Sequence, residues 1–596
     1  MTVYVRKPKS LTRKCRSLFY LCVFGLFIYY ILPLFNFHRY LDIEYGHRLF
    51  SKLNKSQAEF YAPNQTCRFP VLDPFDPSIL KFIQHPLPLK CSPLQPEITY
   101  AKQNKVYLDE KLAYKSELTK LQYQYFRRAN GSDSSVFYNP WKPFPTSGEI
   151  SLSHWSGVVL KGTYNKTFTY SNIYASIEPL YDRTKNKDPQ ADAYRPNIVI
   201  IGIDSVSRSN VIRNLPLTYK YLMEEIGGWD MRGYVKIDDN TFPNMVAVLT
   251  GHKATVQKSE FKLNPSHEFV DEWPFIWKNL SNIGYTTMLA EEQPGIFSYK
   301  APGFKKQPTD YEIEKLDSIL ATWLEKIHKK ELLRNTLLFI TSDHGNRFDK
   351  IRSTLIGRYE ERMPFLFMRP PQEMLNRFPA IENALTTNLY RMSCHYDFYE
   401  TLIDIVKGEY GNVQRPRLKN RGYSLFNEIP TNRTCKDVEI EEHFCVCQEE
   451  TSLSITDPLV EKSAKAILEQ INESLNPVKE RCLPVELSSI ISAEKLTANK
   501  KVQNNNRYHY AQLLSDKNVT NIISFVRVTL QTSPNKGIFE GVVQVTQASP
   551  TNPKIIAAVT GYDNISRINT YGNAANCVSL THRYLEKFCT CREAGF

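Results

Sequence analysis

The sequence predicts an α/β fold in which a mostly parallel sheet carries helices on both faces, followed by a small C-terminal α+β domain that contains disulfides. Between residues 195 and 407, continuous apolar runs alternate with amphipathic stretches, as in sheets built from strand–helix–strand units. Beyond residue 431, three stretches alternate apolar and polar side chains in the manner of antiparallel strands, at residues 522–531, 538–547 and 554–560. Cysteines flank these stretches, so we expect disulfides in this second domain.

The first element of the chain is a predicted membrane anchor. Residues 17–37 contain no charged side chain and, at about 1.5 Å per helical residue, can cross a hydrocarbon core of about 30 Å. Every charged residue in residues 1–16 is basic, and basic flanks stay in the cytoplasm. We therefore expect a cytoplasmic tail, one transmembrane helix and a lumenal or extracellular remainder. A cleaved signal peptide is the alternative, although its apolar core is shorter and ends at small residues.

Cysteines and glycosylation sites agree with that compartment. The number of cysteines after the anchor is even, as a disulfide framework requires, and Asn-x-Ser/Thr acceptor sites are spread over the chain. The cysteines are Cys67, Cys91, Cys394, Cys435, Cys445, Cys447, Cys482, Cys577, Cys589 and Cys591. A single cysteine followed by Cys-x-Cys occurs twice and suggests a half-repeat. Metal binding is the competing explanation, but no four-ligand zinc spacing is completed, and the connectivity stays open.

The remaining chain divides into a stem over residues 38–90, an α/β domain over 91–430 and a cysteine-containing domain over 431–596. Within the α/β domain we expect buried strands at residues 198–203 and 336–341 and an amphipathic helix at residues 311–332. These predictions rest on continuous apolar runs for the strands and on one apolar face for the helix.

The charge balance excludes one class of partner. The formal net charge is +13, and about half of it comes from the tail. A nucleic-acid-binding protein requires a concentrated basic face or a recognisable motif, and neither occurs in this sequence. We therefore predict no nucleic-acid-binding domain.

Acidic residues and a histidine follow the two predicted strands. The first strand ends at Asp204, and the second is followed by Asp343 and His344. Ligands of parallel sheets collect at the carboxyl ends of strands, and carboxylates with an imidazole suit Zn²⁺ or Mn²⁺. The purely structural alternatives are a helix N-cap for Asp204 and a strand-ending turn for Asp343, His344 and Gly345.

Thr241 marks a third candidate position. It stands two residues before Pro243, and a short apolar helix follows and ends at Gly251. Since proline favours the first turn of a helix, Thr241 lies at or next to an N-cap, where backbone N–H groups attract an anion. A hydroxyl beside a divalent ion loses its proton more easily and can act as a nucleophile. A plain N-cap is the structural alternative.

In combination these motifs resemble the alkaline phosphatase superfamily. Asp204, the Thr-Phe-Pro-Asn run that starts at Thr241, and the run of Asp343, His344 and Gly345 occur in the order of that superfamily. The fuller pattern is most similar to the sulfatase-like metazoan membrane proteins of domain of unknown function 229, over about residues 90–450. The resemblance implies an alkaline-phosphatase-like core in which Asp204, Thr241, Asp343 and His344 hold one divalent metal, with Thr241 also the nucleophile.

The sequence departs from two related patterns. Two-metal members place a further His and Asp ahead of the helix that leads to Asp-His-Gly, whereas here no histidine occurs between Asp310 and His328. A formylglycine sulfatase needs Cys or Ser at the nucleophile position, which is Thr241 in this chain. The resemblance therefore implies one ion and disfavours that type of sulfatase. We expect Arg347 and Arg358 to lie near the pocket and bind the substrate anion.

Two functions follow as hypotheses. The first is a membrane-anchored, lumenal or extracellular, metal-dependent phosphoester hydrolase or phosphotransferase that uses Thr241. The second is a catalytically impaired sulfatase-like ectodomain that binds a glycan or a protein, motivated by the absent second-metal residues.

The predicted topology can be tested directly. Because the bulk of the chain should face the lumen or the exterior, its acceptor asparagines should carry glycans. Glycosidase treatment of the cell-expressed chain should therefore increase its gel mobility, and an unchanged mobility would contradict the orientation.

Overall fold

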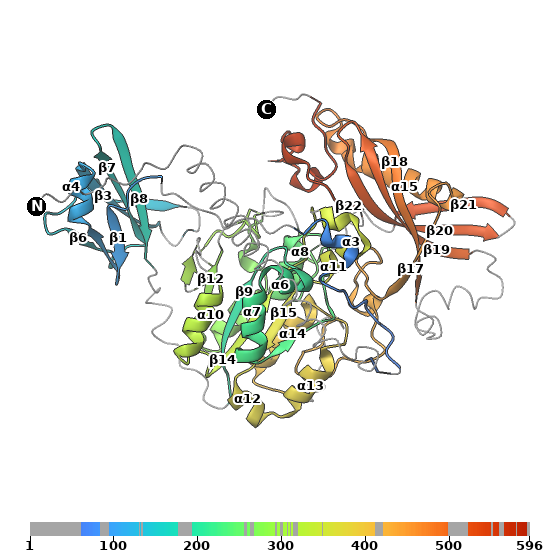
Figure 1. Ribbon diagram of the computed structural model, residues 1–596, viewed down its shortest axis with the longest axis horizontal. Coiled ribbons are helices and arrows are strands. Elements are labelled where there is room, and N and C mark those ends of the chain that lie inside the picture. Colours follow the sequence, from blue (N-terminus) through green and yellow to red (C-terminus); the bar gives the residue numbers. More distant parts are fainter. Residues whose placement is uncertain are drawn as a thin grey trace, which may run out of the picture.

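Figure 1 shows the computed structural model, in which a central α/β part lies between two parts rich in strands. The structure describes residues 61–592 apart from positions 63, 84–93, 130–131, 133–134, 177–192, 255–258, 263–267, 292–294, 299–301, 307, 310, 314–319, 349, 412–420, 499–521, 550–551, 560–564 and 580. The predicted tail, the predicted anchor at 17–37 and much of the stem lie outside the described residues. Within the part that is described, no helix is both long and apolar enough to cross a membrane.

The central part is built on a four-stranded sheet in the order β10–β15–β14–β9. Its strands are β9 (Asn197–Gly202), β14 (Thr336–Thr341), β15 (Leu366–Arg369) and β10 (Trp229–Asp230). β9 and β14 are parallel, whereas β15 is antiparallel to β14 and β10 is antiparallel to β15. Both strands expected from apolar runs are thus present, β14 with the expected bounds and β9 one residue earlier.

Both faces of this sheet are buried. Along β14, Leu337 and Phe339 belong to one core cluster, while Leu338 and Ile340 belong to another. This alternation follows from strand geometry, since successive side chains point to opposite faces. A strand with apolar side chains on both faces requires cover on both.

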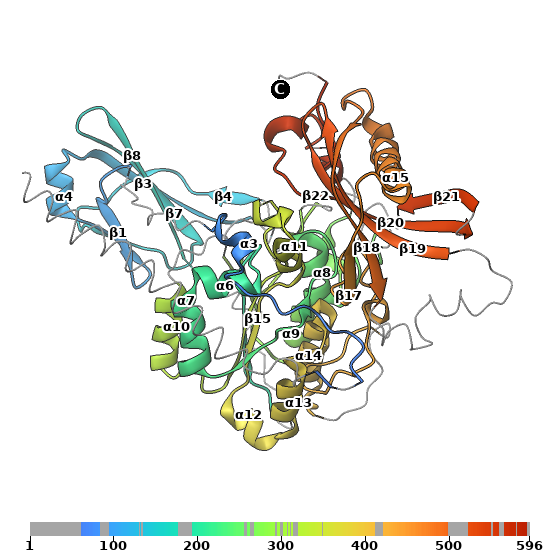
Figure 2. The same cartoon turned by 45° about the vertical axis from the view of Figure 1, so that its right-hand side comes forward.

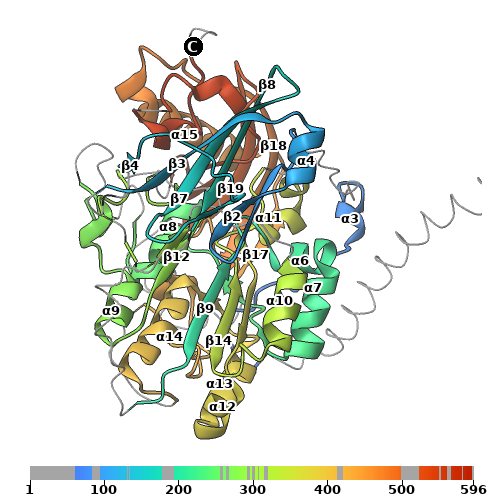
Figure 3. The same cartoon turned by 90° about the vertical axis from the view of Figure 1, so that its left-hand side faces the viewer.

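Two groups of helices provide that cover (Figure 3). One face packs against α8 (Thr241–Thr250), α9 (Ile276–Asn282) and α14 (His395–Lys407). The other face packs against α6 (Arg208–Asn214), α7 (Pro216–Lys220), the π-helix η1 (Tyr221–Ile226) and α10 (Leu320–Lys329). The other helices are α3 (Pro77–Leu80), α4 (Glu110–Lys115), η2 (Val270–Glu272), η3 (Lys350–Ser353), α11 (Leu355–Arg362), α12 (Gln372–Arg377), α13 (Ala380–Asn388), η5 (Cys435–Val438), α15 (Pro458–Leu475), η6 (Asn476–Val478), η8 (Gly572–Ala575) and η9 (Arg583–Leu585).

The central part differs from the prediction in two respects. Its main sheet is mixed rather than mostly parallel, and further parallel pairs form separate two-stranded sheets: β11 (Tyr234–Val235) with β16 (Ser393–Cys394), and β12 (Met288–Ala290) with β13 (Tyr311–Ile313). The helix expected from residue 311 is wrong at its start. Because β13 pairs with β12, the residues there gain hydrogen bonds outside their own segment, and tertiary pairing overrides the local helical pattern.

Residues 99–175 form a β-rich unit with its own core. β1 (Thr99–Lys102), β2 (Lys105–Leu108) and β6 (Glu149–Ser151) make one sheet. β3 (Thr119–Arg128), β4 (Val136–Tyr138), β5 (Lys142–Pro143), β7 (Gly157–Tyr164) and β8 (Phe168–Ala175) make a second. Their shared apolar cluster contains Val106, Ile150 and Leu160. The stretch predicted as one domain over 91–430 therefore contains two structural parts.

The C-terminal part is a six-stranded antiparallel sheet with one long helix (Figure 2). The strands are β17 (Gln448–Ser452), β18 (Glu486–Ala498), β19 (Ile522–Ser533), β20 (Ile538–Ser549), β21 (Asn552–Val559) and β22 (Ile565–Arg567). α15 packs Val460, Ile467 and Ile471 into the same apolar cluster as Val526 and Val543 of the sheet. A helix on one face of an antiparallel sheet is an α+β arrangement.

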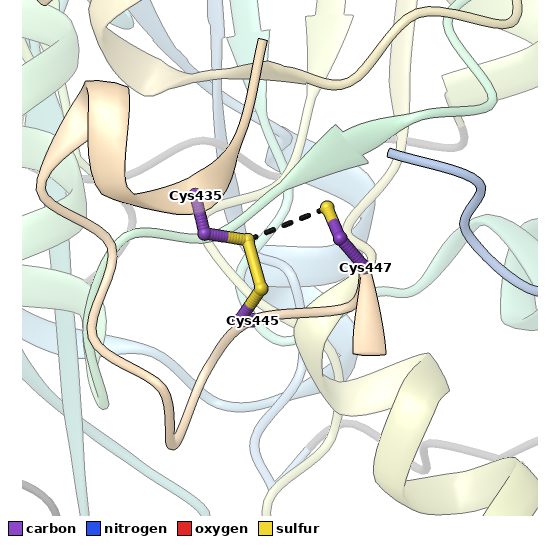
Figure 4. A group of neighbouring side chains, drawn as sticks. All are labelled: Cys435, Cys445 and Cys447. Atoms are coloured by element: carbon purple, nitrogen blue, oxygen red, sulfur yellow. Dashed lines mark hydrogen bonds between the residues drawn. A yellow bond between two sulfur atoms is a disulfide. The ribbon is translucent and has the colours of Figure 1, made fainter. Parts of the chain in front are cut away.

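Four disulfides lie in the described chain, and two of them, Cys67–Cys447 and Cys482–Cys589, connect distant segments. The four disulfides are Cys67–Cys447, Cys435–Cys445, Cys482–Cys589 and Cys577–Cys591. Figure 4 shows Cys435–Cys445 beside Cys447, whose Sγ is 3.4 Å from the Sγ of Cys435. These sulfurs are already paired and offer no thiolate to a metal.

The two cysteine patterns do not form a structural repeat. The single cysteine pairs with the first member of Cys-x-Cys in one pattern, Cys435–Cys445, and with the second member in the other, Cys577–Cys591. Cys394, one of the ten cysteines counted for the predicted disulfide framework, is a buried free thiol. Cys91 lies outside the described residues.

A buried charge cluster joins the C-terminal sheet to α11 and η3. Glu540 on β20 is 2.9 Å from Arg358, 2.8 Å from Arg362 and 3.1 Å from Arg352. Burial alone would raise the pKa of Glu540, but the surrounding arginines outweigh it and hold the pKa well below its usual range. The carboxylate is therefore charged in the folded chain, and removing it leaves buried cations without their partner.

We expect Glu540→Gln to destabilise the chain by about 3–5 kcal/mol, because it leaves buried guanidinium groups uncompensated. Thermal unfolding of the purified full-length chain measures the effect. Glu469→Gln is the control, since Glu469 forms an exposed pair with Lys465, which contributes at most about 1 kcal/mol. Equal melting temperatures for the two variants would contradict the structural role of Glu540.

Candidate active site

The carboxyl ends of β9 and β14 bring two acidic residues to one edge of the central sheet. The parallel register pairs Gly202 with Thr341, so Asp204 and Asp343 follow their strands by the same number of residues. The strand ends are also joined directly, because the backbone N–H of Ser205 donates to Asp343 Oδ1 over 3.0 Å. Ser205 has a φ of 62°, a left-handed conformation that non-glycine residues adopt mainly at turns and functional sites.

Thr241 reaches the same edge at the start of α8. It is the first residue of the helix, which ends at Gly251 with a φ of 69°. The N-cap is Asn240, whose side chain makes no capping hydrogen bond, so the first N–H groups of the helix have no side-chain cap. Such groups and the helix dipole favour an anion at this end.

Asn244 fixes the loop that leads to Thr241. Its Oδ1 accepts from the backbone N–H of Ile237 over 2.9 Å, and its Nδ2 donates to the backbone carbonyls of Asp238 and Asn240, each over 2.9 Å. Asn244 is fully buried, so these bonds are shielded from water. The asparagine of the Thr-Phe-Pro-Asn run therefore fixes the backbone of the preceding loop, and its side-chain hydrogen bonds are used for that contact.

The other three predicted ligand side chains lie around Nε2 of His344, the fourth predicted ligand. This atom is 3.1 Å from Asp343 Oδ2, 3.4 Å from Thr241 Oγ1 and 3.9 Å from Asp204 Oδ1. The ligand atoms of Asp204, Asp343 and His344 all lie within 4.8 Å of one another. Asp343 and His344 are buried, whereas the side chain of Asp204 is 69% exposed, so the cluster opens toward solvent on that side.

The protonation of His344 suits a metal ligand. Its Nδ1 lies 2.8 Å from the backbone carbonyl of Gly345, which only accepts, so Nδ1 carries the proton. The lone pair of Nε2 then faces the cluster, as in histidine ligands whose other nitrogen donates to a carbonyl. Asp343 Oδ2 is buried and accepts no hydrogen bond within the described chain. An oriented imidazole and an unpartnered carboxylate oxygen fit a divalent cation.

The residues on either side of His344, Asp343 and Gly345, are also restricted by their surroundings. Burial would raise the pKa of Asp343, but its electrostatic interaction with His344 and its hydrogen bonds from the Ser205 N–H and the Thr241 hydroxyl outweigh burial and lower the pKa. Asp343 is therefore ionised at neutral pH, as a metal ligand must be. A Cβ at Gly345 would lie 2.2 Å from the backbone oxygen of Glu360, so only glycine fits after His344.

Arg347 lies beside the loop that carries Thr241. Its Nη1 donates to Asp239 Oδ2 over 2.9 Å and to the backbone carbonyl of Asp239 over 3.3 Å. The Arg347 side chain is 18% exposed. This placement leaves Arg347 as a candidate for binding an anion at the site.

Arg358 lies elsewhere, contrary to the expectation that it is near the pocket. It is buried among Glu450 at 2.8 Å, Glu494 at 3.3 Å and Glu540 at 2.9 Å. Three carboxylates of the C-terminal part already compensate its charge. Its position therefore gives no support to a role in substrate binding.

The described residues contain no second group of histidine and acidic side chains that resembles another metal site. His328 on α10 is 2.9 Å from the hydroxyl of Tyr221 and packs against its ring. It is thus part of the helix packing on one face of the sheet. Residues 310 and 314–319, which precede α10, lie outside the described chain.

Sequence reasoning missed three residues around the site: Asn244, Asp239 and Ser566. Asn244 carried a local signal, since it follows Thr241 in the same helical turn and can reach the preceding loop. Asp239 also stood next to the motif. Ser566 Oγ donates to Asp239 Oδ1 over 2.7 Å from 327 positions away, and no local pattern predicts such a contact.

The comparisons with known proteins identify a family. Residues 150–316 and 312–491 match the model of a family described as "Protein of unknown function (DUF229)". The two matches overlap at residues 312–316. No curated protein matches the chain.

Several solved structures match the chain. One of them is a protein in the alkaline phosphatase superfamily from Vibrio parahaemolyticus, with 10% sequence identity, and the similarity covers 69% of this chain and 88% of that one. The TM-score is 0.24, too low for the similarity to establish a shared fold.

If the cluster binds a divalent ion, Asp343→Asn should reduce the metal content of the purified full-length chain, because it removes the buried charge next to His344 Nε2. Metal analysis after dialysis against Zn²⁺ or Mn²⁺ measures the stoichiometry. Glu469→Gln, an exposed change on α15, should retain the parental content. Equal metal content in Asp343→Asn and the parent would remove Asp343 as a ligand.

Proposed function

The chain belongs to the DUF229 family, and we propose that this member is a metal-dependent phosphoester hydrolase or phosphotransferase whose nucleophile is Thr241. The observation that carries the proposal is the convergence of Asp204, Thr241, Asp343 and His344 on one point, with Asp343 Oδ2 unpartnered. The sequence motifs that contain these four residues occur along the chain in the order found in the alkaline phosphatase superfamily.

The donor set favours a single Zn²⁺ or Mn²⁺ ion. Carboxylate oxygens, a hydroxyl and a neutral imidazole nitrogen suit these ions better than they suit Ca²⁺ or Cu⁺. A divalent ion held by these side chains supplies positive charge that stabilises the added negative charge of a phosphoryl-transfer transition state.

The chain itself contributes orientation and charge. Thr241 is β-branched and begins α8, so its hydroxyl has few rotamers and sits where uncapped N–H groups face an anion. The carbonyl of Gly345 holds the ring of His344, and Asp239 holds Arg347 beside the loop before Thr241. Arg347 offers planar donors for a non-bridging phosphoryl oxygen.

The reaction we propose has two transfers. The Thr241 hydroxyl loses its proton as its oxygen forms a bond to phosphorus, while the bond from phosphorus to the leaving oxygen breaks. That oxygen keeps the electron pair and takes up a proton, so that it departs as an alcohol. Water or a second alcohol then attacks phosphorus and loses a proton, and the Thr241 oxygen leaves phosphorus with the electron pair and is reprotonated. Water gives hydrolysis and a second alcohol gives phosphotransfer.

A second candidate function is glycan or protein binding by a catalytically impaired chain. It is favoured by the absence of a histidine between Asp310 and His328, where two-metal members of the superfamily place further ligands. For either function we propose the same topology, with residues 1–16 in the cytoplasm, an anchor over 17–37 and the bulk of the chain lumenal or extracellular.

Thr241→Ala and Thr241→Ser separate the two functions. If Thr241 attacks phosphorus, Ala should lower turnover of a generic phosphodiester or phosphomonoester by on the order of 10³-fold or more, and Ser should retain measurable turnover. Metal content should be largely kept in both variants, because Asp204, Asp343 and His344 remain.

The stability of these variants provides the control. Asn240, not Thr241, is the N-cap, so Thr241→Ala removes no capping bond and should leave the melting temperature close to the parental value. Parental turnover in a folded Thr241→Ala chain would eliminate Thr241 as the nucleophile and favour the binding function.

A further inference from the structure

The C-terminal sheet contacts the loop that leads to Thr241. β20 and β22 are antiparallel, and their register places Glu540 directly opposite Ser566, so both side chains lie on one face. Glu540 binds the arginines of α11 and η3, and Ser566 Oγ lies 2.7 Å from Asp239 Oδ1. Ser566 and Asp239 are both buried. The docked sheet therefore reaches a residue two positions before the proposed nucleophile.

The hydrogen-bond directions around Ser566 are fixed by their partners. An ionised Asp239 only accepts, so the Ser566 hydroxyl donates to it. His443 Nε2 lies 3.0 Å from Ser566 Oγ and must therefore donate its proton to that oxygen. Burial lowers the pKa of His443 well below its usual range, so the ring is neutral, which is consistent with its buried and unpartnered Nδ1. The hydroxyl proton of Ser566 is therefore donated to Asp239 and not to His443.

Asp239 transmits this contact to Arg347. Its Oδ1 accepts from Ser566, and its Oδ2 accepts from Arg347 Nη1 over 2.9 Å. Because the two oxygens belong to one carboxylate, the bond from Ser566 restricts rotation of the group that accepts from Arg347, which also donates to the Asp239 backbone carbonyl over 3.3 Å. Lys236 fixes the backbone at the same position, since its Nζ donates to the Asp239 carbonyl over 3.1 Å.

We propose that Ser566 and Asp239 are positioning residues that hold Arg347 for the anionic oxygens of a phosphoester, so that the C-terminal domain contributes to the site. This inference rests on the proposed function, because it takes the anion to be the substrate of Thr241. It assigns the C-terminal domain a role in substrate binding in addition to its structural contact with α11.

A double-mutant cycle on the full-length, Zn²⁺-loaded chain tests the inference, with inorganic phosphate as the binding probe. Ser566→Ala removes one hydrogen bond and should weaken phosphate binding roughly 2- to 10-fold, the range of a net hydrogen bond. Arg347→Ala removes a charged donor and should weaken it about 10- to 100-fold. In the double variant, loss of Ser566 should have almost no added effect, because it acts through Arg347.

Three further measurements separate positioning from general stability. Ser566→Thr keeps the hydroxyl and should restore most of the affinity. Ser463→Ala removes a buried hydroxyl of the same domain that bonds only within α15, and it should bind phosphate like the parent. In turnover, Ser566→Ala should raise KM more than it lowers kcat.

The outcomes are distinct. A parent that binds no phosphate and turns over no phosphoester would overturn both the proposed function and this inference. A parent that binds phosphate, together with Ser566→Ala at parental affinity or with fully additive effects of Ser566→Ala and Arg347→Ala, would overturn the inference alone.

Discussion

The parallel register of β9 and β14 is the constraint on which the candidate site depends. Pairing Gly202 with Thr341 makes the two strands end level, and this places Asp204 and Asp343 at the same edge. A shift of the register by one residue would turn every second side chain to the opposite face. A shift of this register is disfavoured because both faces of the sheet are buried, with Leu337 and Phe339 in one core cluster and Leu338 and Ile340 in the other. Core packing and site geometry are therefore set by the same pairing.

The loop before α8 shows how the rest of the molecule supports that edge. Residues 236–240 are held from inside by Asn244, from the central domain by Arg347, and from the C-terminal sheet by Ser566. Lys236 adds a buried ion pair with Glu361 on α11. Because these contacts come from different elements, the position of Thr241 depends on how α8, α11 and the C-terminal sheet pack together.

The attachment of the C-terminal domain combines charge and covalent bonds. Buried ion pairs are costly to desolvate, so the cluster around Glu540 favours one specific docking arrangement more than it adds stability. The disulfide Cys67–Cys447 closes a separation of 380 residues and restricts the unfolded chain. Together these features keep β22 against the loop before Thr241.

The sequence by itself determined the features that depend on short-range patterns. Continuous apolar runs predicted β14 with its observed bounds and β9 within one residue, and short motifs predicted that Asp204, Thr241, Asp343 and His344 would meet. That these side chains bind a metal stays a prediction. Strand periodicity and turn preferences depend on residues close together in the chain, so a single sequence is enough to recognise them.

Only the tertiary structure decided which distant residues meet. The pairing of β13 with β12, the burial of Arg358 among three glutamates and the contact of Ser566 with Asp239 all join segments far apart along the chain or compete with a plausible local pattern. The two similar cysteine patterns pair differently for the same reason, since each thiol bonds with the partner that folding brings near. Such contacts depend on the packing of whole sheets against one another, and no local sequence pattern encodes them.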